Sequence, residues 1–316
     1  GFLRRERREN RERKERDRRL WAIGQRSDVL LWERLSSRDI SPLTLYRLRF
    51  DESTISPLDK MTNDKRRACN YSRRQMKILQ ELLESLKIDL PVTAGVVGSH
   101  LMAVASQRLG LAAHLHSQGQ SGAVVSEEGV ETLIGRHTRD LAHWLLEDHW
   151  VRAGIGMAAL NSVLEIDHQA LIEVNAKQII ADRAIGKNLM VVGHFPFIGQ
   201  LRSKVRNLWV MEKEPRSGDL SEEEGYQALA EADVVAITGS CLINHTFDRI
   251  MANCKPGSFK VMLGPSTPLS TILLDCGLDV IGGALVEEKS TVLKMVKDGV
   301  PFRQMEGIRN VVMTKD

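Results

Sequence analysis

The sequence predicts an α/β protein in which a small α+β unit precedes a domain built on a parallel sheet. From residue 175 onward, unbroken apolar runs alternate with helical patterns, which is typical of a parallel sheet covered on both faces. Before that point the predicted order is strand, strand, helix, helix, which indicates a smaller mixed unit. The chain of 316 residues is long enough for about two domains.

The smaller unit begins with a pattern over 74–86 in which apolar residues recur three or four positions apart. This spacing predicts an amphipathic helix. Short apolar runs at 92–97 and 109–115 predict strands, and the patterns at 138–146 and 155–164 predict helices. Around the last of these helices, small residues permit close packing; they are Gly154, Gly156, Ala158 and Ala159.

The larger unit contains several short apolar runs, each followed by glycine, a hydroxyl residue, proline or an acid. The predicted strands are 189–192, 208–211, 233–237, 260–263 and 280–281, and helices are expected at 198–205, 247–251, 269–274 and 291–296. Ser221 followed by Glu224 predicts a capping box at the start of one more helix. Because ligands of open α/β sheets bind at the carboxyl ends of the strands, we expect the site at that edge.

Charge is distributed unevenly along the chain. Residues 1–60 hold 16 Lys and Arg against 11 Asp and Glu, whereas residues 61–316 hold 28 against 30. The basic run 4–19 has no apolar face, and it can be an arm that contacts nucleic-acid phosphates, a solvated tail, or a stretch outside the native protein. We favour the last interpretation, with the native start at Met61, because the regular apolar pattern begins only after that residue. Nucleic-acid binding is therefore disfavoured.

The composition excludes several other classes of protein. A hydrophobic fraction of 42% and a charged fraction of 27% are those of a globular chain rather than a disordered one. The four cysteines contain no CxxC pair, which favours a reducing compartment over a disulfide scaffold or a thiolate zinc cage. No apolar stretch approaches the roughly 18 residues of a membrane-spanning helix. We expect a cytoplasmic protein without a membrane partner, and a homo-oligomer stays open.

Polar groups follow the strands of the larger unit at positions where they could hold an anion. The candidates are His194 after the first strand, Thr238, Gly239, Ser240 and Asn244 after the third, and Gly264, Ser266 and Thr267 after the fourth. Hydroxyls and backbone N–H groups in such turns can bind a carboxylate or a phosphate. Helix capping is the alternative for Ser240, Asn244, Ser266 and Thr267.

Two other kinds of ligand, a nucleotide and a metal ion, are possible at the carboxyl ends of these strands. Glu212 lies 19 residues after Gly193, where a dinucleotide fold places the acid that binds a ribose. His194 is the best candidate for a working histidine, and Cys241 could add a thiolate metal ligand if its turn folds over His194.

The ordered turns of the larger unit resemble those of the putative heavy-metal chelation family, a domain family of unknown activity. The resemblance rests on four segments: residues 192–197, 212–215, 238–246 and 263–268. The segment 154–162 resembles the small partner domain of that family, which has an enolase N-terminal-like fold. The resemblance implies a Rossmann-like second domain and a site in the cleft between the domains, to which Asn161 of the smaller domain contributes. It implies that this cleft is lined by His194, Pro196, Glu212, Thr238, Asn244, Gly264, Ser266 and Thr267.

We therefore expect three segments: a charged extension at 1–60, an enolase N-terminal-like α+β domain at 61–170 and a Rossmann-like domain at 171–316. The family context implies that the cleft binds a small anionic or metal-chelating ligand, with a transition metal or a metal chelate as the cofactor. Two alternatives stay open, a nucleotide-dependent enzyme that uses Glu212 and nucleic-acid binding by the basic arm. The sequence names no reaction.

Overall fold

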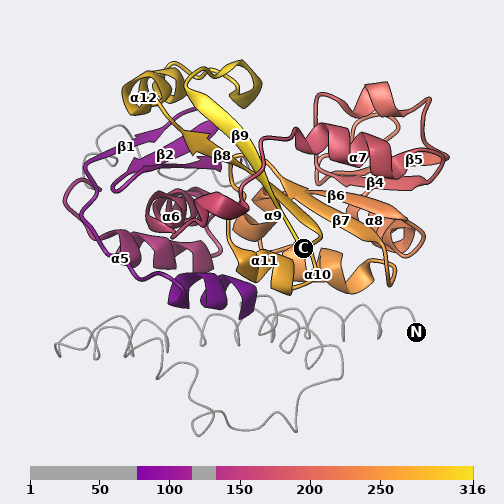
Figure 1. Cartoon of the computed structure of the whole chain (residues 1–316), viewed down its shortest axis with the longest axis horizontal. Helices are drawn as coiled ribbons and strands as arrows, with labels where there is room; N and C mark the ends of the chain where they lie inside the picture. The colour runs from indigo at the N-terminus through magenta and orange to yellow at the C-terminus, as the bar shows by residue number, and fades with distance from the viewer. Residues whose placement is uncertain (1–76, 116–132, 316) are drawn as a thin grey trace, which may run out of the picture. The chain divides into compact units, whose positions relative to one another are not determined.

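The computed structural model describes residues 77–115 and 133–315. All of them belong to one compact unit, shown in colour in Figure 1. The expectations for residues 1–60 and for a start at Met61 lie outside the described residues. No helix in the described ranges is long and apolar enough to span a membrane.

The smaller sheet has three antiparallel strands in the order β1-β2-β3. Residues 77–84 form a helix before it, as the apolar spacing predicts. The middle strand was not predicted from the sequence, in which only the runs 92–97 and 109–115 were expected as strands. The elements of this part are β1 (Ala94–Val97), β2 (Leu101–Ala105), β3 (Leu109–Ala113), α5 (Thr138–Ala142), the 3-10 helix η3 (His143–Leu146) and α6 (Trp150–Val163).

The larger sheet has six strands in the order β5-β4-β6-β7-β8-β9. Five of them are parallel, which confirms the predicted parallel sheet, and the last, which was not predicted, is antiparallel to β8. Its polar residues Arg309 and Asn310 obscured a strand whose other side chains pack inward. The strands are β4 (Asn188–Val192), β5 (Asn207–Met211), β6 (Val234–Thr238), β7 (Phe259–Leu263), β8 (Val280–Val286) and β9 (Ile308–Thr314).

Helices cover both faces of this sheet. On one face, Ile180 and Ala184 of α7 pack against Val191 and neighbouring residues. On the other face, α8 to α11 enclose a second layer that includes Met190, Ile237 and Met262. The bounds are α7 (Ala176–Ala184), η5 (Ile198–Leu201), α8 (Glu222–Leu229), α9 (Ser240–Ile243), α10 (Phe247–Asn253), α11 (Thr271–Asp275) and α12 (Lys289–Lys297). The capping box of Ser221 and Glu224 is confirmed, whereas the helix expected at 198–205 is only the short η5.

The two sheets share their hydrophobic cores. The smaller sheet presents Met102 and Val104 to α6, and that core continues into the α8–α11 layer of the larger sheet. Its opposite face packs on Val292 and Val296 of α12, which comes from the far end of the chain. Figure 1 shows α6 and α12 on opposite sides of β1 and β2. The division at residue 171 stays a prediction, but its two sides pack as one body.

Close backbone approach holds α6 against the smaller sheet. A Cβ atom added at Gly110 in β3 would lie 2.0 Å from the carbonyl oxygen of Ala158 in α6. A Cβ atom at Gly156 would lie 2.4 Å from the backbone nitrogen of Leu145. The expectation of close packing around α6 is therefore confirmed.

One carboxylate oxygen is buried within the α8–α11 layer. Oδ2 of Asp248 in α10 is inaccessible and has no hydrogen-bond partner within the described ranges. Burial raises the pKa of the Asp248 carboxyl to about 6. Asp248 therefore costs stability whenever it is ionised in the folded state.

Gly110→Ala should lower the free energy of unfolding by about 3 kcal/mol, because neither backbone can yield without displacing α6. Urea denaturation of the purified protein measures this change. Gly199→Ala is the matched control, since an added Cβ meets nothing within 4 Å there, and it should change stability by less than about 0.5 kcal/mol. Equal effects of the two substitutions would contradict the close packing of α6 on β3.

Asp248→Asn should stabilise the protein at neutral pH. The folded-state pKa lies above the ordinary aspartate value of 3.8, so the folded state binds more protons and stability falls as pH rises from about 4 through 6. The neutral amide avoids this loss, and we expect a gain of about 1 kcal/mol at pH 8 after allowance for partial exposure. Urea denaturation across this pH range should show the two proteins converging below about pH 4. A constant difference at every pH would contradict the assignment.

Candidate functional site

The carboxyl ends of β4, β5, β6 and β7 lie at one edge of the larger sheet. The register pairs Val192 of β4 with both Met211 of β5 and Ile237 of β6. Thr238 at the end of β6 pairs with Leu263 at the end of β7. The predicted site residues that follow these strands therefore meet at a single edge, which we call the carboxyl edge.

The turn after β4 contacts both neighbouring strands. Gly193 has a φ of +98°, which favours glycine, and its N–H donates to the Met211 carbonyl at 3.0 Å. A Cβ atom at this position would lie 3.0 Å from Cγ2 of Thr238. This packing places His194 directly beyond the sheet, beside the end of β5.

His194 makes the most informative polar contact at the carboxyl edge. Its Nε2 lies 2.8 Å from Oδ2 of Asp219, which also accepts from the backbone N–H of Arg216 at 2.8 Å. The imidazole side chain is 32% exposed and the carboxylate is 8% exposed. Partial burial raises the pKa of Asp219, but the hydrogen bonds from His194 and Arg216 outweigh it and the net pKa is lowered.

This pairing fixes the roles of the two ring nitrogens. An ionised Asp219 can only accept, so Nε2 of His194 carries the hydrogen. In the neutral ring, Nδ1 is then an acceptor, and no described residue donates a hydrogen bond to it. Asp219 was not predicted from the sequence, because its separation of 25 residues from His194 matches no recognised motif.

The segment 212–219 joins the end of β5 to Asp219, the hydrogen-bond partner of His194. Glu212 accepts a hydrogen bond from the N–H of its neighbour Lys213 at 3.2 Å. Nζ of Lys213 lies 4.8 Å from the ring centroid of Trp150 at the start of α6. This segment therefore connects the carboxyl edge to α6, the helix that packs on the smaller sheet.

Pro196, in the turn after β4, is exposed between Phe195 and Phe197, whose rings stack with centroids 5.6 Å apart.

The turns after β6 and β7 touch one another. Oγ1 of Thr238 contacts Oγ of Ser240 at 3.2 Å and accepts from the Ser240 N–H at 3.3 Å. A Cβ atom at Gly239 would lie 2.6 Å from Oγ1 of Thr267. That Thr267 oxygen is buried and has no hydrogen-bond partner in the part of the chain that the structure describes. A buried hydroxyl without a partner is uncommon in folded proteins.

Two predicted site residues bind the backbone of β3 instead of facing open space. Oγ of Ser266 accepts from the Ala113 N–H at 2.8 Å, and Nδ2 of Asn161 donates to the Leu111 carbonyl at 3.0 Å. Because Leu111 and Ala113 are two positions apart, their backbone groups point to the same side of the strand. Ser266 and Asn161 thus satisfy one edge of the smaller sheet, and they tie it to the carboxyl edge.

The remaining predicted residues have mainly local roles. Oδ1 of Asn244 accepts from both the N–H and the hydroxyl of Thr246, at 3.3 and 2.7 Å. Gly264 has a φ of +123° and lies in the turn after β7. Ser270, rather than Ser266 or Thr267, caps α11.

Cys241 lies inside the core rather than beside His194. It belongs to α9, it is 1% exposed, and burial raises the pKa of its thiol well above the ordinary value. A protonated, enclosed thiol argues against the predicted thiolate ligand. Within residues 77–115 and 133–315, no three or more His, Cys, Asp or Glu side chains are grouped to hold a metal ion.

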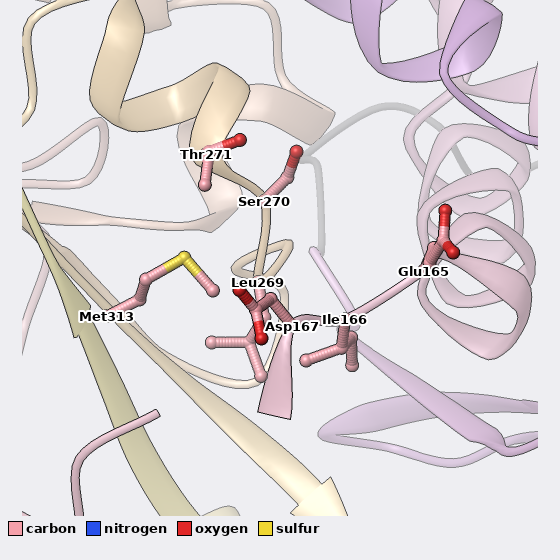
Figure 2. Close-up of a pocket in the computed structure, with 7 residues that line it drawn as sticks. All are labelled: Glu165, Ile166, Asp167, Leu269, Ser270, Thr271 and Met313. Atoms are coloured by element: carbon pink, nitrogen blue, oxygen red, sulfur yellow. The ribbon is translucent and has the colours of Figure 1, made fainter. Parts of the chain in front are cut away.

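A pocket of about 380 Å³ lies beyond the turn that follows β7. Figure 2 shows Glu165, Ile166 and Asp167 entering from the connection after α6, and Met313 entering from β9. Leu269, Ser270 and Thr271 complete its lining. None of the sequence-predicted site residues lines this pocket, and no motif in the sequence marked it.

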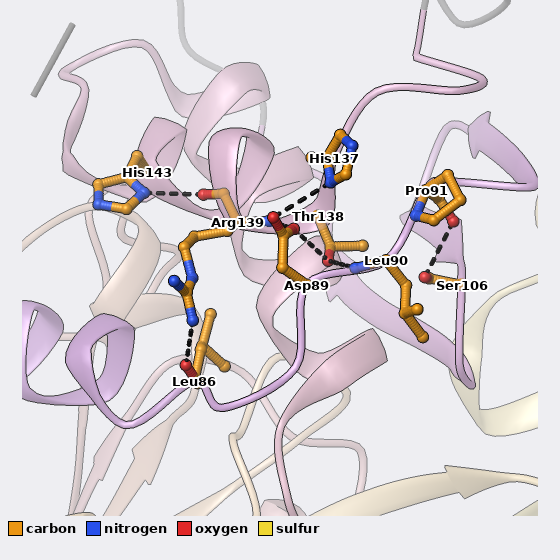
Figure 3. A network of polar contacts seen from close by, with 9 residues as sticks. All are labelled: Leu86, Asp89, Leu90, Pro91, Ser106, His137, Thr138, Arg139 and His143. Carbon is orange, nitrogen blue, oxygen red and sulfur yellow. Dashed lines mark hydrogen bonds and ion pairs between the residues drawn. The ribbon is translucent and has the colours of Figure 1, made fainter. Parts of the chain in front are cut away.

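A second polar network lies at the start of α5 and includes the side chains of Asp89, His137 and Thr138. Asp89 accepts from the Arg139 N–H at 3.0 Å and contacts Nδ1 of His137 at 3.1 Å, as Figure 3 shows. Thr138 accepts from the N–H of Leu90 at 3.1 Å. Asp89 thus caps α5 from a distant part of the chain, which is a structural role.

Comparison with known proteins identifies the family. Two family models match the chain, at residues 79–164 and 175–315, and both carry the description "Putative heavy-metal chelation". An uncharacterised protein of Methanocaldococcus jannaschii is 29% identical over 124 residues, which are 37% of this chain and 47% of that protein. The chain thus spans about half the length of that curated relative.

Two crystal structures of proteins of unknown function share the fold. One, from Desulfitobacterium hafniense, has a TM-score of 0.67 and 22% identity over 77% of this chain and 99% of its own. The other, from Pyrococcus horikoshii, has a TM-score of 0.64 and 19% identity over 76% of this chain and 99% of its own. Both belong to the family matched at residues 175–315, and the predicted fold class is confirmed. With both models matching in order, the chain belongs to the putative heavy-metal chelation family.

Proposed function

We propose that the protein binds a small metal-chelating molecule or its metal complex at the carboxyl edge, with His194 as the donor that faces the metal. The observation that carries the proposal is the hydrogen bond between Nε2 of His194 and Asp219. Histidines that bind metals usually donate their other ring N–H to a carboxylate or carbonyl, which orients the ring and raises its basicity. Nδ1 of His194 is the nitrogen left for a metal.

The donor groups at the carboxyl edge suit a metal that is already bound by a chelating molecule. The described residues offer one oriented imidazole at this edge and no group of three metal-binding side chains. The chelating molecule would fill the other coordination positions of the metal, so the protein does not need to surround the metal with its own side chains. Imidazole suits zinc, copper, iron and nickel, so the identity of the metal stays open.

The neighbouring turns supply groups that suit the organic part of such a ligand. Thr238 and Ser240 place hydroxyls beside the turn after β4, and Thr267 keeps a buried hydroxyl without a partner. Hydroxyls of this kind bind the carboxylates that most chelating molecules carry. The contact between Lys213 and Trp150 places this region against α6, consistent with a cleft between the two parts of the chain. We also propose that the protein is cytoplasmic, because the cysteine pattern favours a reducing compartment.

His194→Ala should weaken the binding of a metal chelate at least tenfold. Isothermal titration of the untagged full chain with nickel nitrilotriacetate, which leaves coordination positions open for imidazole, measures the affinity. Asp219→Asn should weaken binding by about 10-fold to 100-fold, because it removes the acceptor that orients the ring. Nickel ions alone serve as a second titrant and distinguish binding of the free ion from binding of the complex.

His100→Ala is the matched control, because His100 is also exposed and lies in the turn between β1 and β2, outside the four strand ends that define the carboxyl edge. It should leave the affinity unchanged. The proposal fails if neither titrant releases heat, or if the His194 and His100 variants bind equally well.

A further inference from the structure

A concentration of positive charge lies at the amino end of the larger sheet, opposite the carboxyl edge. Five exposed cations occupy the end of α7 and the turns before β4 and β5: Arg183, Lys187, Arg202, Lys204 and Arg206. Asp182 is the single acid in segments 182–187 and 202–207, so these segments carry a net charge of +4. Residues 61–316 together carry −2, so this charge is a local feature and not an average one.

Backbone hydrogen bonds join the two turns into one surface, which we call the basic face. The Gly186 N–H donates to the Lys204 carbonyl at 2.9 Å, and the Arg206 N–H donates to the Lys187 carbonyl at 2.8 Å. Cations that are distant in sequence are therefore neighbours in space. Like charges held together in this way repel one another unless an anion lies against them.

Little on the protein neutralises the basic face. Within the described ranges, none of its five cations forms an ion pair within 4.0 Å. Arg183 stacks over the Phe259 ring at 4.5 Å, which leaves its charge in place. Arg206 lies near Asp233, but that carboxylate already pairs with Lys255 at 2.7 Å.

An apolar side chain projects from the middle of this charge. Ile185 is 61% exposed, the highest value among the exposed large hydrophobic residues in the described ranges. It lies between Arg183 and Lys187 at the turn from α7 to β4. An aliphatic side chain gains little from phosphates alone, but it gains from entering the boundary between headgroups and acyl chains of a bilayer.

We propose that the basic face binds the surface of an anionic phospholipid membrane, with its cations on the headgroups and Ile185 inserted between them. Clusters of four to eight Lys and Arg are typical of such contacts. This contact is peripheral and goes beyond the proposed function at the opposite edge. It also differs from our expectation of no membrane partner, which rested on the lack of a spanning segment.

Sedimentation of the full chain with phosphatidylcholine vesicles, with and without phosphatidylserine, tests the proposal. The native protein should bind only vesicles that contain phosphatidylserine. Lys187→Gln/Lys204→Gln should lower the partition coefficient about 25-fold, since each cation near the surface contributes about fivefold. Ile185→Ser should lower it several-fold without changing the charge.

Lys289→Gln/Lys294→Gln is the matched control, because both side chains are exposed on α12, which covers the smaller sheet, and the change in net charge is equal. It should leave partitioning near the native value, whatever residues 1–60 contribute. The proposal is overturned if the native protein does not bind, or if the two double variants lose binding equally. It is also overturned if Ile185→Ser binds vesicles as the native protein does, since the face would then recognise phosphates such as those of nucleic acids.

Discussion

The clamping of the smaller sheet between α6 and α12 is the constraint on which the rest of the molecule depends. α6 lies against one face, with Gly110 allowing its backbone to approach, and α12 returns from the far end of the chain to cover the other face. The core on the α6 side continues without interruption beneath the larger sheet. As a result, the start of α6 is held against the segment after β5, and β3 is held against the turn after β7.

This arrangement explains why the chemistry gathers at one edge. The parallel register aligns the ends of β4 to β7, and the shared core brings Trp150 and Asn161 of α6 to the same region. The pair of His194 and Asp219 adds an oriented nitrogen at that edge. The basic face lies at the opposite end of the same strands, so binding of a chelate and contact with a membrane would not compete for one surface.

Much of the larger sheet could be predicted from sequence, because strands buried on both faces appear as unbroken apolar runs with a polar residue at each end. The capping box at Ser221 was predictable for a similar reason, since its two residues interact locally. β9 was not predictable in this way, because Arg309 and Asn310 interrupt its pattern. Asp219 and Ser266 act on residues far away in sequence, and only the folded chain brings them together. Cys241 follows a polar turn, but α9 directs it into the core.

Long-range proton–nitrogen NMR of the His194 ring tests the central claim most directly, because it reports which nitrogen carries the hydrogen. We predict that Nε2 is protonated in the free protein and that the Nδ1 resonance shifts when a diamagnetic zinc nitrilotriacetate complex is added. A ring protonated at Nδ1 in the free protein, or an Nδ1 resonance that the complex leaves unchanged, would contradict the account.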